Sequence, residues 1–229
     1  MALNFAAIHT STLTTSNLLL DIFSHLTLEP LLREEAFANE GLSAEKWNRA
    51  RLNRMPLLDS ALRESQRRWG LVAKALSRKV MRPDGVTLPN GQRLPHGTTV
   101  CVSGWGLHHD AETYQRPFEF VPDRFMSKVS GTVEPGAAKS KQHVAAETNQ
   151  QYVAWGIGKH ACPGRFFAVD FIKLIVLRII LEYDIMPLER RPENVWIEYN
   201  VMPPPTATLT VRRRKGHDPN NGRAHTLNA

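Results

Sequence analysis

Apolar residues recur with helical spacing in several stretches of the 229-residue chain. Apolar residues three or four positions apart predict a helix over residues 3–27. The β-branched threonines in the middle of this stretch lower its intrinsic helicity. A short helix is expected over Leu31–Glu40, and Ser43 can cap the start of another. Residues 55–69 form a strongly amphipathic pattern. Residues 164–183 are apolar nearly all round, which predicts a buried helix.

The pattern over residues 71–102 changes to short β-prone pieces separated by glycine and proline. The dipeptide Asn90-Gly91 predicts a tight hairpin turn. A short helix is expected over residues 105–114, and the polar stretch 116–150 is expected to be mostly loop. The predicted strands cover residues 86–88, 92–94, 98–102, 195–199 and 206–212. The chain is therefore expected to be mainly α with small β-sheets.

The net charge of +7 allows three kinds of partner: nucleic acid, an anionic membrane surface or an acidic protein. The basic residues are scattered, except for the run at 212–215, so we expect no nucleic-acid partner. Residues 213–229 are polar without apolar periodicity, and we interpret them as a basic, disordered tail. The alternative is a basic docking face for an acidic redox partner.

Residues 1–20 carry no formal charge when His9 is neutral, but their many Ser, Thr and Asn residues are too polar for a membrane span. They also lack the positive segment of a signal peptide. The stretch is typical of the middle of a buried helix, which predicts a product truncated at its N-terminus. The two cysteines, Cys101 and Cys162, are too few for a disulfide framework or a zinc site, so a reducing intracellular compartment is expected.

Residues 155–165 read WGIGKHACPGR and immediately precede the long apolar helix. The glycines allow a tightly bent backbone, and Cys162 lies where the free N–H groups of a helix start favour thiolate over thiol. Lys159, His160 and Arg165 add positive charge nearby. A thiolate held in this way is a good ligand for iron.

Two other interpretations of Cys162 follow from the residues alone. A lone cysteine is most often a small buried core residue. It could also be the nucleophile of a cysteine hydrolase with His160 as its base, although a spacing of two residues makes that geometry awkward and no orienting group is evident.

The 155–165 segment resembles the haem-binding loop of cytochromes P450, an aromatic residue followed by Gly-x-Gly-x-basic-x-Cys-x-Gly. The resemblance implies that Cys162 is the axial ligand of the haem iron and that His160 binds a haem propionate. Trp155 stands where the family usually has Phe, and its ring would pack against the loop and shield the sulfur. Gly158 and Gly164 occupy the second and last glycine positions of the pattern.

Further segments resemble the same family in the same order along the chain. Glu64 and Arg67 match its Glu-x-x-Arg helix, where residues three apart share a face and can pair. Residues 120–125 resemble its Pro-x-Arg-Phe segment, which implies that Arg124 completes a buried triad with Glu64 and Arg67. Because a buried charge needs partners, the three residues depend on one another.

Residues 6–11 resemble the oxygen-binding groove of the family's long central helix, with Ala7 in place of Gly and His9 in place of the acid. The resemblance implies that Thr10 and His9 are the catalytic positions, with Thr10 helping to protonate bound dioxygen. Arg78 matches a second propionate-binding arginine. The segment His108-His109-Asp110 resembles the family's His-Arg-Asp motif, with His109 where Arg is usual, and we interpret it as structural.

The resemblance implies the C-terminal portion of the cytochrome P450 fold, from the long central helix to the end, over residues 1–212. It further implies haem b as cofactor and insertion of one oxygen atom from O2 into a small organic substrate. Electrons would come from NADPH through NADPH–cytochrome P450 reductase. Fungal-like motifs suggest secondary metabolism, and the family suggests the endoplasmic reticulum membrane, although the anchor is absent. The alternative is a catalytically silent haem-binding relic of a longer enzyme.

Overall fold

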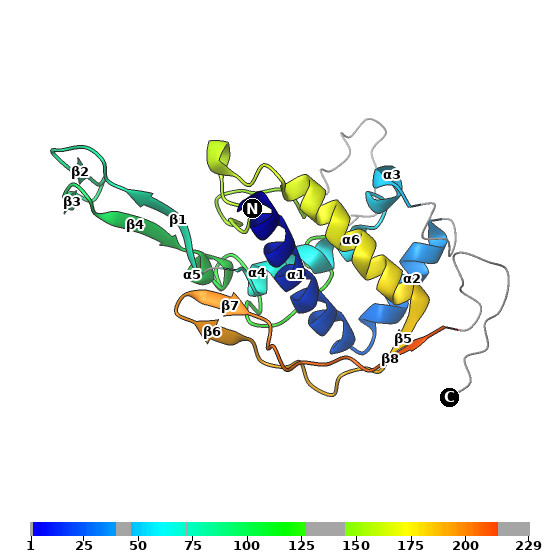
Figure 1. Cartoon of the computed structure of the whole chain (residues 1–229). Helices are drawn as coiled ribbons and strands as arrows, with labels where there is room; N and C mark the ends of the chain where they lie inside the picture. The colour runs from blue at the N-terminus through cyan, green and yellow to red at the C-terminus, as the bar shows by residue number, and fades with distance from the viewer. Residues whose placement is uncertain (1, 40–46, 72, 127–144, 215–229) are drawn as a thin grey trace.

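The computed structural model describes residues 2–39, 47–71, 73–126 and 145–214 (Figure 1). Helices form most of the regular secondary structure in this part of the chain, and short strands project from it or border it. The helices are α1 (Ala2–Phe23), α2 (Leu28–Ala38), α3 (Arg49–Leu52), α4 (Pro56–Arg68), α5 (Gly104–His108) and α6 (Arg165–Glu182), with a 3-10 turn over Gly158–His160. None of the helices so described is long and apolar enough to cross a membrane.

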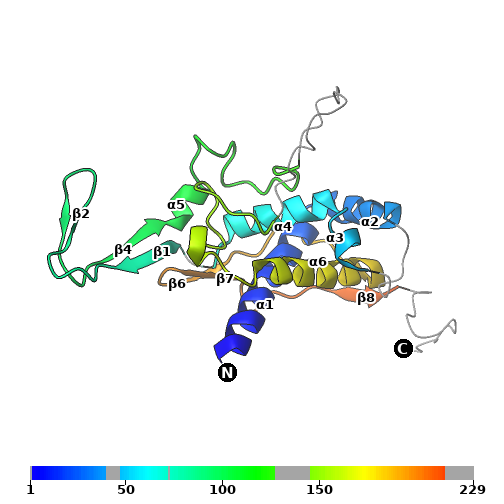
Figure 2. The ribbon, with the colours of Figure 1, turned by 90° about the horizontal axis from the view of Figure 1, so that it is seen from above.

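The core lies where α1, α2, α4 and α6 pack side by side (Figures 1 and 2). Each helix contributes side chains that are less than 5% exposed, and each fully buried Leu or Ile stabilises the fold by about 1.5–3 kcal/mol. These side chains include Leu18, Ile22, Leu28, Leu32, Leu58, Leu62, Ile172, Val176 and Ile180. The apolar pattern that predicted the helices is thus the pattern that buries them.

The start of α4 receives its cap from another helix. Pro56 occupies the first turn, where its missing N–H costs nothing. The carboxylate of Glu35 on α2 accepts hydrogen bonds from the N–H groups of Leu57, at 2.7 Å, and Leu58, at 3.1 Å. Burial raises the pKa of Glu35, and the two backbone donors oppose that rise. Two helices that are separate in sequence are therefore joined through one side chain.

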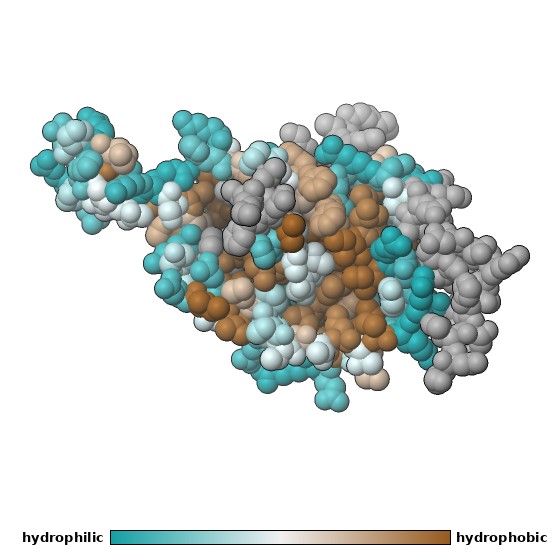
Figure 3. Space-filling model, viewed as in Figure 1, coloured by the Kyte–Doolittle hydropathy of each residue, from teal (hydrophilic) through white to brown (hydrophobic). Residues whose placement is uncertain are grey.

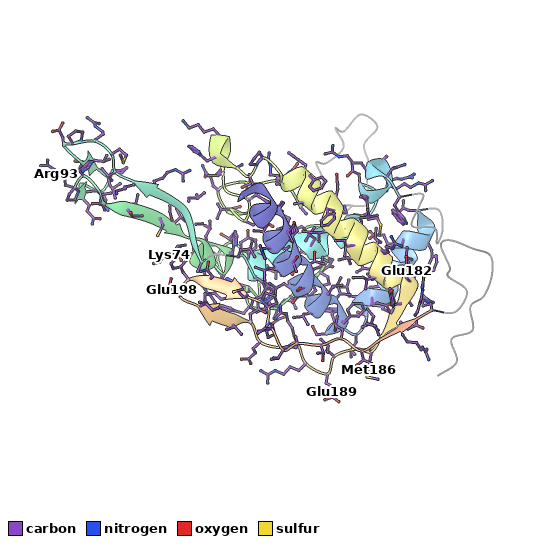
Figure 4. The ribbon with its side chains drawn as sticks, viewed as in Figure 1. Lys74, Arg93, Glu182, Met186, Glu189 and Glu198 are labelled. Atoms are coloured by element: carbon purple, nitrogen blue, oxygen red, sulfur yellow. The ribbon has the colours of Figure 1, made fainter. Side chains whose placement is uncertain are left out.

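A β arm extends away from the helices in both views (Figures 1 and 2). Strand β1 (Lys74–Lys79) pairs antiparallel with β4 (Thr99–Ser103), and β2 (Val86–Thr87) pairs with β3 (Arg93–Leu94) at the far end. Arg93 marks that far end and Lys74 the base (Figure 4). Gly91 has a φ of +83°, as a turn residue without a side chain permits, so the Asn90-Gly91 turn is confirmed.

The last part of the chain forms two further antiparallel pairs. Strand β5 (Tyr183–Ile185) pairs with β8 (Val211–Arg213), and β6 (Val195–Ile197) pairs with β7 (Asn200–Met202). The β6–β7 hairpin turns at Glu198, which has a positive φ of 56° and lies close to Lys74 in Figure 4. Arg213 belongs to β8, and residues 215–229 of the expected tail lie outside the described residues.

Several predicted boundaries were wrong. The helix expected over residues 105–114 ends at His108, because the Asp110 carboxylate accepts hydrogen bonds from the Glu112 N–H and the Thr113 hydroxyl and so favours a turn. The strand expected over 195–199 ends at Ile197, where the hairpin turns. In the predicted strand 206–212, pairing begins only at Val211.

The second helix begins at Leu28, so that Pro30 falls inside its first turn rather than before it. It ends at Ala38, two residues earlier than expected. The helix predicted from Ser43 lies outside the described residues.

The surface of α6 carries exposed aromatic side chains. Phe167 is 71% exposed and Phe171 is 42% exposed, and their rings stack 5.9 Å apart. Apolar residues gather on the face of the molecule that α1 and α6 share (Figure 3). The prediction that this helix is buried holds only for the side that packs on the core, because Phe167, Phe171 and Leu174 on its other side are exposed among the described residues.

Candidate functional site

A fully buried carboxylate connects α4 with the loop that follows α5. Glu64 is 0% exposed and accepts two hydrogen bonds from Arg67, from Nε at 2.8 Å and from Nη2 at 2.9 Å. Arg124 donates from its Nε to the same carboxylate at 2.9 Å, and the Val121 N–H donates at 3.2 Å. Paired, two-point bonds of this kind are the strong form of an ion pair. The structure therefore places the three predicted residues in direct contact.

The remaining donors of the two arginines bind backbone carbonyls. Arg67 donates to the carbonyls of His108 and Pro117, the latter at 2.8 Å. Arg124 donates to the carbonyl of Gln115 at 2.6 Å. Because each guanidinium is satisfied by main chain as well as by Glu64, the triad fixes the path of the 108–124 segment over α4.

His108 links this triad to the start of the cysteine loop. Its ring is buried, and its Nε2 accepts a hydrogen bond from the Val153 N–H at 3.0 Å. Burial, reinforced by the nearby Arg67 cation, lowers the pKa of His108 to about 4. The ring is therefore neutral at physiological pH, with its proton on Nδ1, as the Val153 bond requires. This contact agrees with a structural role for the His108–Asp110 segment.

The loop over residues 153–164 bends back on itself before α6. Gly156 has a φ of +77°, and a Cβ there would lie 3.1 Å from the His160 carbonyl oxygen. The Cys162 N–H donates to the Trp155 carbonyl at 2.7 Å, which closes the loop. The Trp155 ring is held by a bond from its Nε1 to the Ala145 carbonyl at 2.8 Å. Only glycine permits this path at residue 156 without displacing backbone.

Cys162 lies directly before α6, half-buried and with its sulfur not joined to Cys101. Arg165, in the first turn of that helix, donates from its Nη1 to the Cys162 carbonyl at 2.8 Å. His160 and Lys159 are exposed in the preceding 3-10 turn. The cysteine thus lies directly before the first turn of a long helix, with Lys159, His160 and Arg165 close to it in sequence.

A cleft of about 460 Å³ lies between the N-terminal half of α1 and the β6–β7 hairpin. Its volume is in the range of small-molecule sites. One wall carries His9, Thr10 and Leu13, and the opposite wall carries Asn200–Met202. The remaining lining comes from residues Arg67, Gly70, Leu71, Ala73, Ala75, Gly104, Trp105, His108, Val153 and Ala154.

A smaller pocket lies between α1 and α6. Thr10 and Thr14 line it from α1, Trp155 from the cysteine loop, and Ala168 and Ile172 from α6. Thr10 lines both this pocket and the larger cleft. The structure therefore brings the predicted groove residue Thr10 together with Trp155 of the predicted ligand loop.

Other predicted site residues lie elsewhere. Arg78 is exposed on β1, and its guanidinium donates to the neighbouring Ser77 carbonyl at 2.8 Å. Neither Arg78 nor His160 lines the two cavities found within the described ranges. Gly158 has a φ of +61°, and open space surrounds the positions where Gly158 and Gly164 would carry a Cβ. These glycines leave the loop surface unobstructed.

The structure also shows functional candidates that sequence reasoning missed. Trp105 lines the cleft and packs edge-on against Trp196 of the hairpin, with ring centroids 4.8 Å apart. Asp21 is buried in α1 and binds Arg191, which precedes the hairpin. A lone acid among the apolar residues 18–23 was the available signal for Asp21, but nothing near it in sequence identified its partner.

This helix-rich arrangement has a half-buried cysteine directly before α6 and a pocket between α1 and α6 that Thr10, Thr14 and Trp155 line. The cytochrome P450 family model matches residues 1–211. Cytochrome P450 monooxygenase 71 of Postia placenta is 39% identical over 214 residues, 92% of this chain and 41% of that protein. Cytochrome P450 monooxygenase avaL of Aspergillus versicolor is 36% identical over 176 residues, 77% of this chain and 30% of that protein.

A solved structure of a zebra fish cytochrome P450 with abiraterone matches with a TM-score of 0.72 at 24% identity, over 91% of this chain and 46% of that one. This likeness shows the fold. The chain belongs to the cytochrome P450 family, and the predicted family and fold class are confirmed. It spans about 41% of the length of the first curated relatives that it matches.

The family implies haem, and the residues present fit it. Haem iron can be held by a single cysteine thiolate, which Cys162 would supply, and the part of the chain that the structure describes holds no group of three or more His, Cys, Asp or Glu that could hold a metal ion. Apolar walls from Trp155, Ala168 and Ile172 face α1 across the smaller pocket. The open surface at Gly164 leaves room for a flat ligand near Cys162.

Proposed function

We propose that this chain carries the haem-binding part of a monooxygenase that inserts one oxygen atom from O2 into a small organic substrate. The observation that carries the proposal is the closed loop that presents Cys162 at the start of α6, next to a pocket shared by Trp155 and Thr10. Bound haem would supply the oxidation chemistry, and the protein would bind, orient and shield.

In this proposal the Cys162 sulfur, directly before α6, would bind the iron. Trp155, tethered to Ala145, shields the sulfur from water. His160 and Arg78 bind the haem propionates; because both are exposed here, binding would have to draw their side chains toward the haem. These assignments follow the family pattern at those positions.

Thr10 and His9 line the cleft from α1. In this proposal the Thr10 hydroxyl would hold a water in the cleft and serve as a proton donor there. His9 stands where the family has an acid, so an imidazole in place of a carboxylate would line this side of the cleft.

The substrate would lie in the cleft between α1 and the β6–β7 hairpin, whose lining is mostly apolar. Electrons would come from NADPH through NADPH–cytochrome P450 reductase, docking on the side of Lys159 and His160. Fungal relatives support a place in secondary metabolism, and the family supports the endoplasmic reticulum membrane as the location.

Haem reconstitution of the purified chain tests the proposal. We expect a carbon-monoxide-shifted thiolate Soret band that Cys162→Ala abolishes and Cys101→Ala, an exposed matched control, leaves intact. Folded chain without this band would refute the haem assignment and reopen the hydrolase interpretation. Oxidation of a substrate with reductase and NADPH then tests turnover.

A catalytically silent haem-binding chain is the second candidate. It is kept because the chain spans about 41% of the length of the first curated relatives that it matches, and because α6 carries an exposed aromatic face, with Phe167 at 71% exposure, of the kind that marks a contact surface. Both candidates predict the Soret band, and only turnover separates them.

A further inference from the structure

The segment between β5 and β6 is bound along the C-terminal half of α1. The Leu188 N–H donates to the Phe23 carbonyl at 2.7 Å. Arg191 donates from its Nη2 to the Asn17 side-chain oxygen at 2.8 Å, and the Asn194 amide donates to the same oxygen at 2.9 Å. The chain therefore enters the β6–β7 hairpin already attached to α1.

Asp21 is the centre of this attachment. Its side chain is 0% exposed and accepts a hydrogen bond from the Arg191 Nε at 2.5 Å. The Ser65 hydroxyl, at 2.6 Å, and the Trp69 Nε1, at 3.1 Å, donate to it from α4 and from the residue after it. The Arg191 guanidinium also lies over the Trp69 ring, 4.1 Å from its centroid. One buried carboxylate thus joins α1, α4 and the segment before β6.

The hairpin that follows forms a wall of the cleft. Asn200–Met202 line the cavity. The hairpin is also bonded to the residue before β1, because the Ala73 N–H donates to the Tyr199 carbonyl at 2.7 Å. Trp196 packs on Trp105. Tyr199 and Trp196 of the hairpin therefore have contacts of their own. The attachment at Arg191 fixes the end of the hairpin nearest α1.

The opposite wall of the cleft is on the same helix. Asn17 and Asp21 follow Thr10 by 7 and 11 positions, so all three lie within about 20° of one face of a helix with 3.6 residues per turn. The face of α1 that presents Thr10 to the cleft continues into the face that binds Arg191. Helix α1 therefore carries Thr10 in one wall of the cleft and also holds the segment that leads into the other wall.

We propose that Arg191 is a positioning residue of the cleft: by binding Asp21 and Asn17, it sets the β6–β7 hairpin at a defined distance from Thr10. The proposal rests on the proposed function insofar as the cleft holds the ligand. Arg191 itself is absent from the cavity lining, so its effect on a ligand passes through the hairpin.

Hydrogen–deuterium exchange of the full chain tests the attachment without haem. In Arg191→Ala, amides of residues 195–202 should exchange about tenfold faster or more, while those of the 56–62 part of α4 stay unchanged. Arg190→Ala is the matched control, because Arg190 is 81% exposed and pairs only with exposed Glu193 among the described residues. Equal exchange in the two variants would overturn the proposal.

If Arg191→Ala fails to fold, the double variant Asp21→Asn, Arg191→Gln keeps an amide pair and removes both charges. It should show the same local increase in exchange. Arg191→Lys retains the charge with fewer donors and should fall between wild type and Arg191→Ala. Unchanged exchange in the folded double variant would equally refute the positioning role.

Ligand size provides the second readout, on haem-reconstituted chain. Arg191→Ala should raise the Kd of 4-phenylimidazole, whose phenyl group is expected to occupy the cleft, about fivefold or more, because a loosened wall must be ordered on binding. The Kd of imidazole should stay within about twofold. Equal weakening of both ligands would show a merely structural role. Chain that binds no haem would refute the proposed function, while the exchange result would still decide the attachment.

Discussion

Glu64 and Asp21 are both buried carboxylates at the centre of a hydrogen-bond network, yet they relate differently to the sequence. Glu64 binds Arg67 one turn along its own helix and Arg124 from a loop. Asp21 has its cation, Arg191, 170 positions away. The first network has a local core that periodicity reveals, whereas the second is assembled entirely from separate elements. A buried network can be predicted from the sequence when its partners are only a few residues apart.

The two networks also differ in how easily their cations could reach water. The Arg67 side chain is 0% exposed, whereas that of Arg191 is 13% exposed and that of Arg68, whose Nη1 lies 3.8 Å from Asp21 Oδ1, is 14% exposed. Loss of Glu64 would leave a charge with no route to solvent. Loss of Asp21 would leave arginines at the margin of the core. The energetic cost of breaking each network should follow this difference.

The largest effect is expected from Glu64→Ala. It leaves Arg67 buried without its carboxylate, which typically costs about 3–5 kcal/mol in the free energy of unfolding. Urea denaturation measures this cost. Glu119→Ala, which removes an exposed partner of Arg116 at the same loop, is the control and should cost less than about 1 kcal/mol. Similar costs for the two variants would contradict the assignment of Glu64 as a buried anchor.

The next effect is a pH dependence from His108, beside the Glu64 network. Its pKa is lowered from 6.5 to about 4, mainly by burial, so the unfolded chain binds the proton more readily than the folded one. Stability is therefore fully present above about pH 6.5 and falls by about 3 kcal/mol as the pH drops to about 4. Urea denaturation across this range should show a slope that His108→Gln reduces. An unchanged slope in that variant would assign the pH dependence to other groups.

A smaller loss is expected from Asp21→Asn. The amide can still accept hydrogen bonds, but the charge pairing with Arg191 is lost, and we expect a cost of about 2 kcal/mol. The measurement is the same urea titration used for Glu64→Ala. A cost above that of Glu64→Ala would reverse the ranking of the two networks and show that Arg191 cannot turn toward solvent.

The smallest effect is expected from Arg190→Ala. This arginine is exposed and its ion pair with Glu193 is on the surface, so its removal should change the free energy of unfolding by less than about 0.5 kcal/mol. Thermal and urea unfolding should match wild type. A large loss would mean that the segment before β6 depends on both neighbouring arginines rather than on Arg191.

Local patterns predicted most elements of the fold. Asn90-Gly91 set the hairpin of the β arm, and the apolar spacing over residues 55–69 and 164–183 set α4 and α6. The errors fall where side chains override periodicity. Asp110 ends the helix after His108 by binding the N–H of Glu112, and such a local competitor is hard to weigh against an apolar pattern.

The candidate site divides in the same way. The cysteine loop and the Glu64–Arg67 pair are contiguous motifs, so their residues could be named beforehand. Arg78 and His160 were also named, but the structure leaves both exposed and outside the cavity lining. Trp105 was missed as a cleft residue, because a lone tryptophan in a short helix gives no indication of what it faces.

By itself, the sequence determined the class of fold, the cysteine at a helix start and the spacing of the Glu64–Arg67 pair, because each depends on residues a few positions apart. Only the tertiary structure decided that Arg191 reaches Asp21, that the His108 ring accepts the Val153 N–H, and that Thr10 shares a pocket with Trp155. Such contacts join distant segments, and their existence depends on how whole helices pack. Packing is set by the sum of many buried side chains, which no single motif encodes.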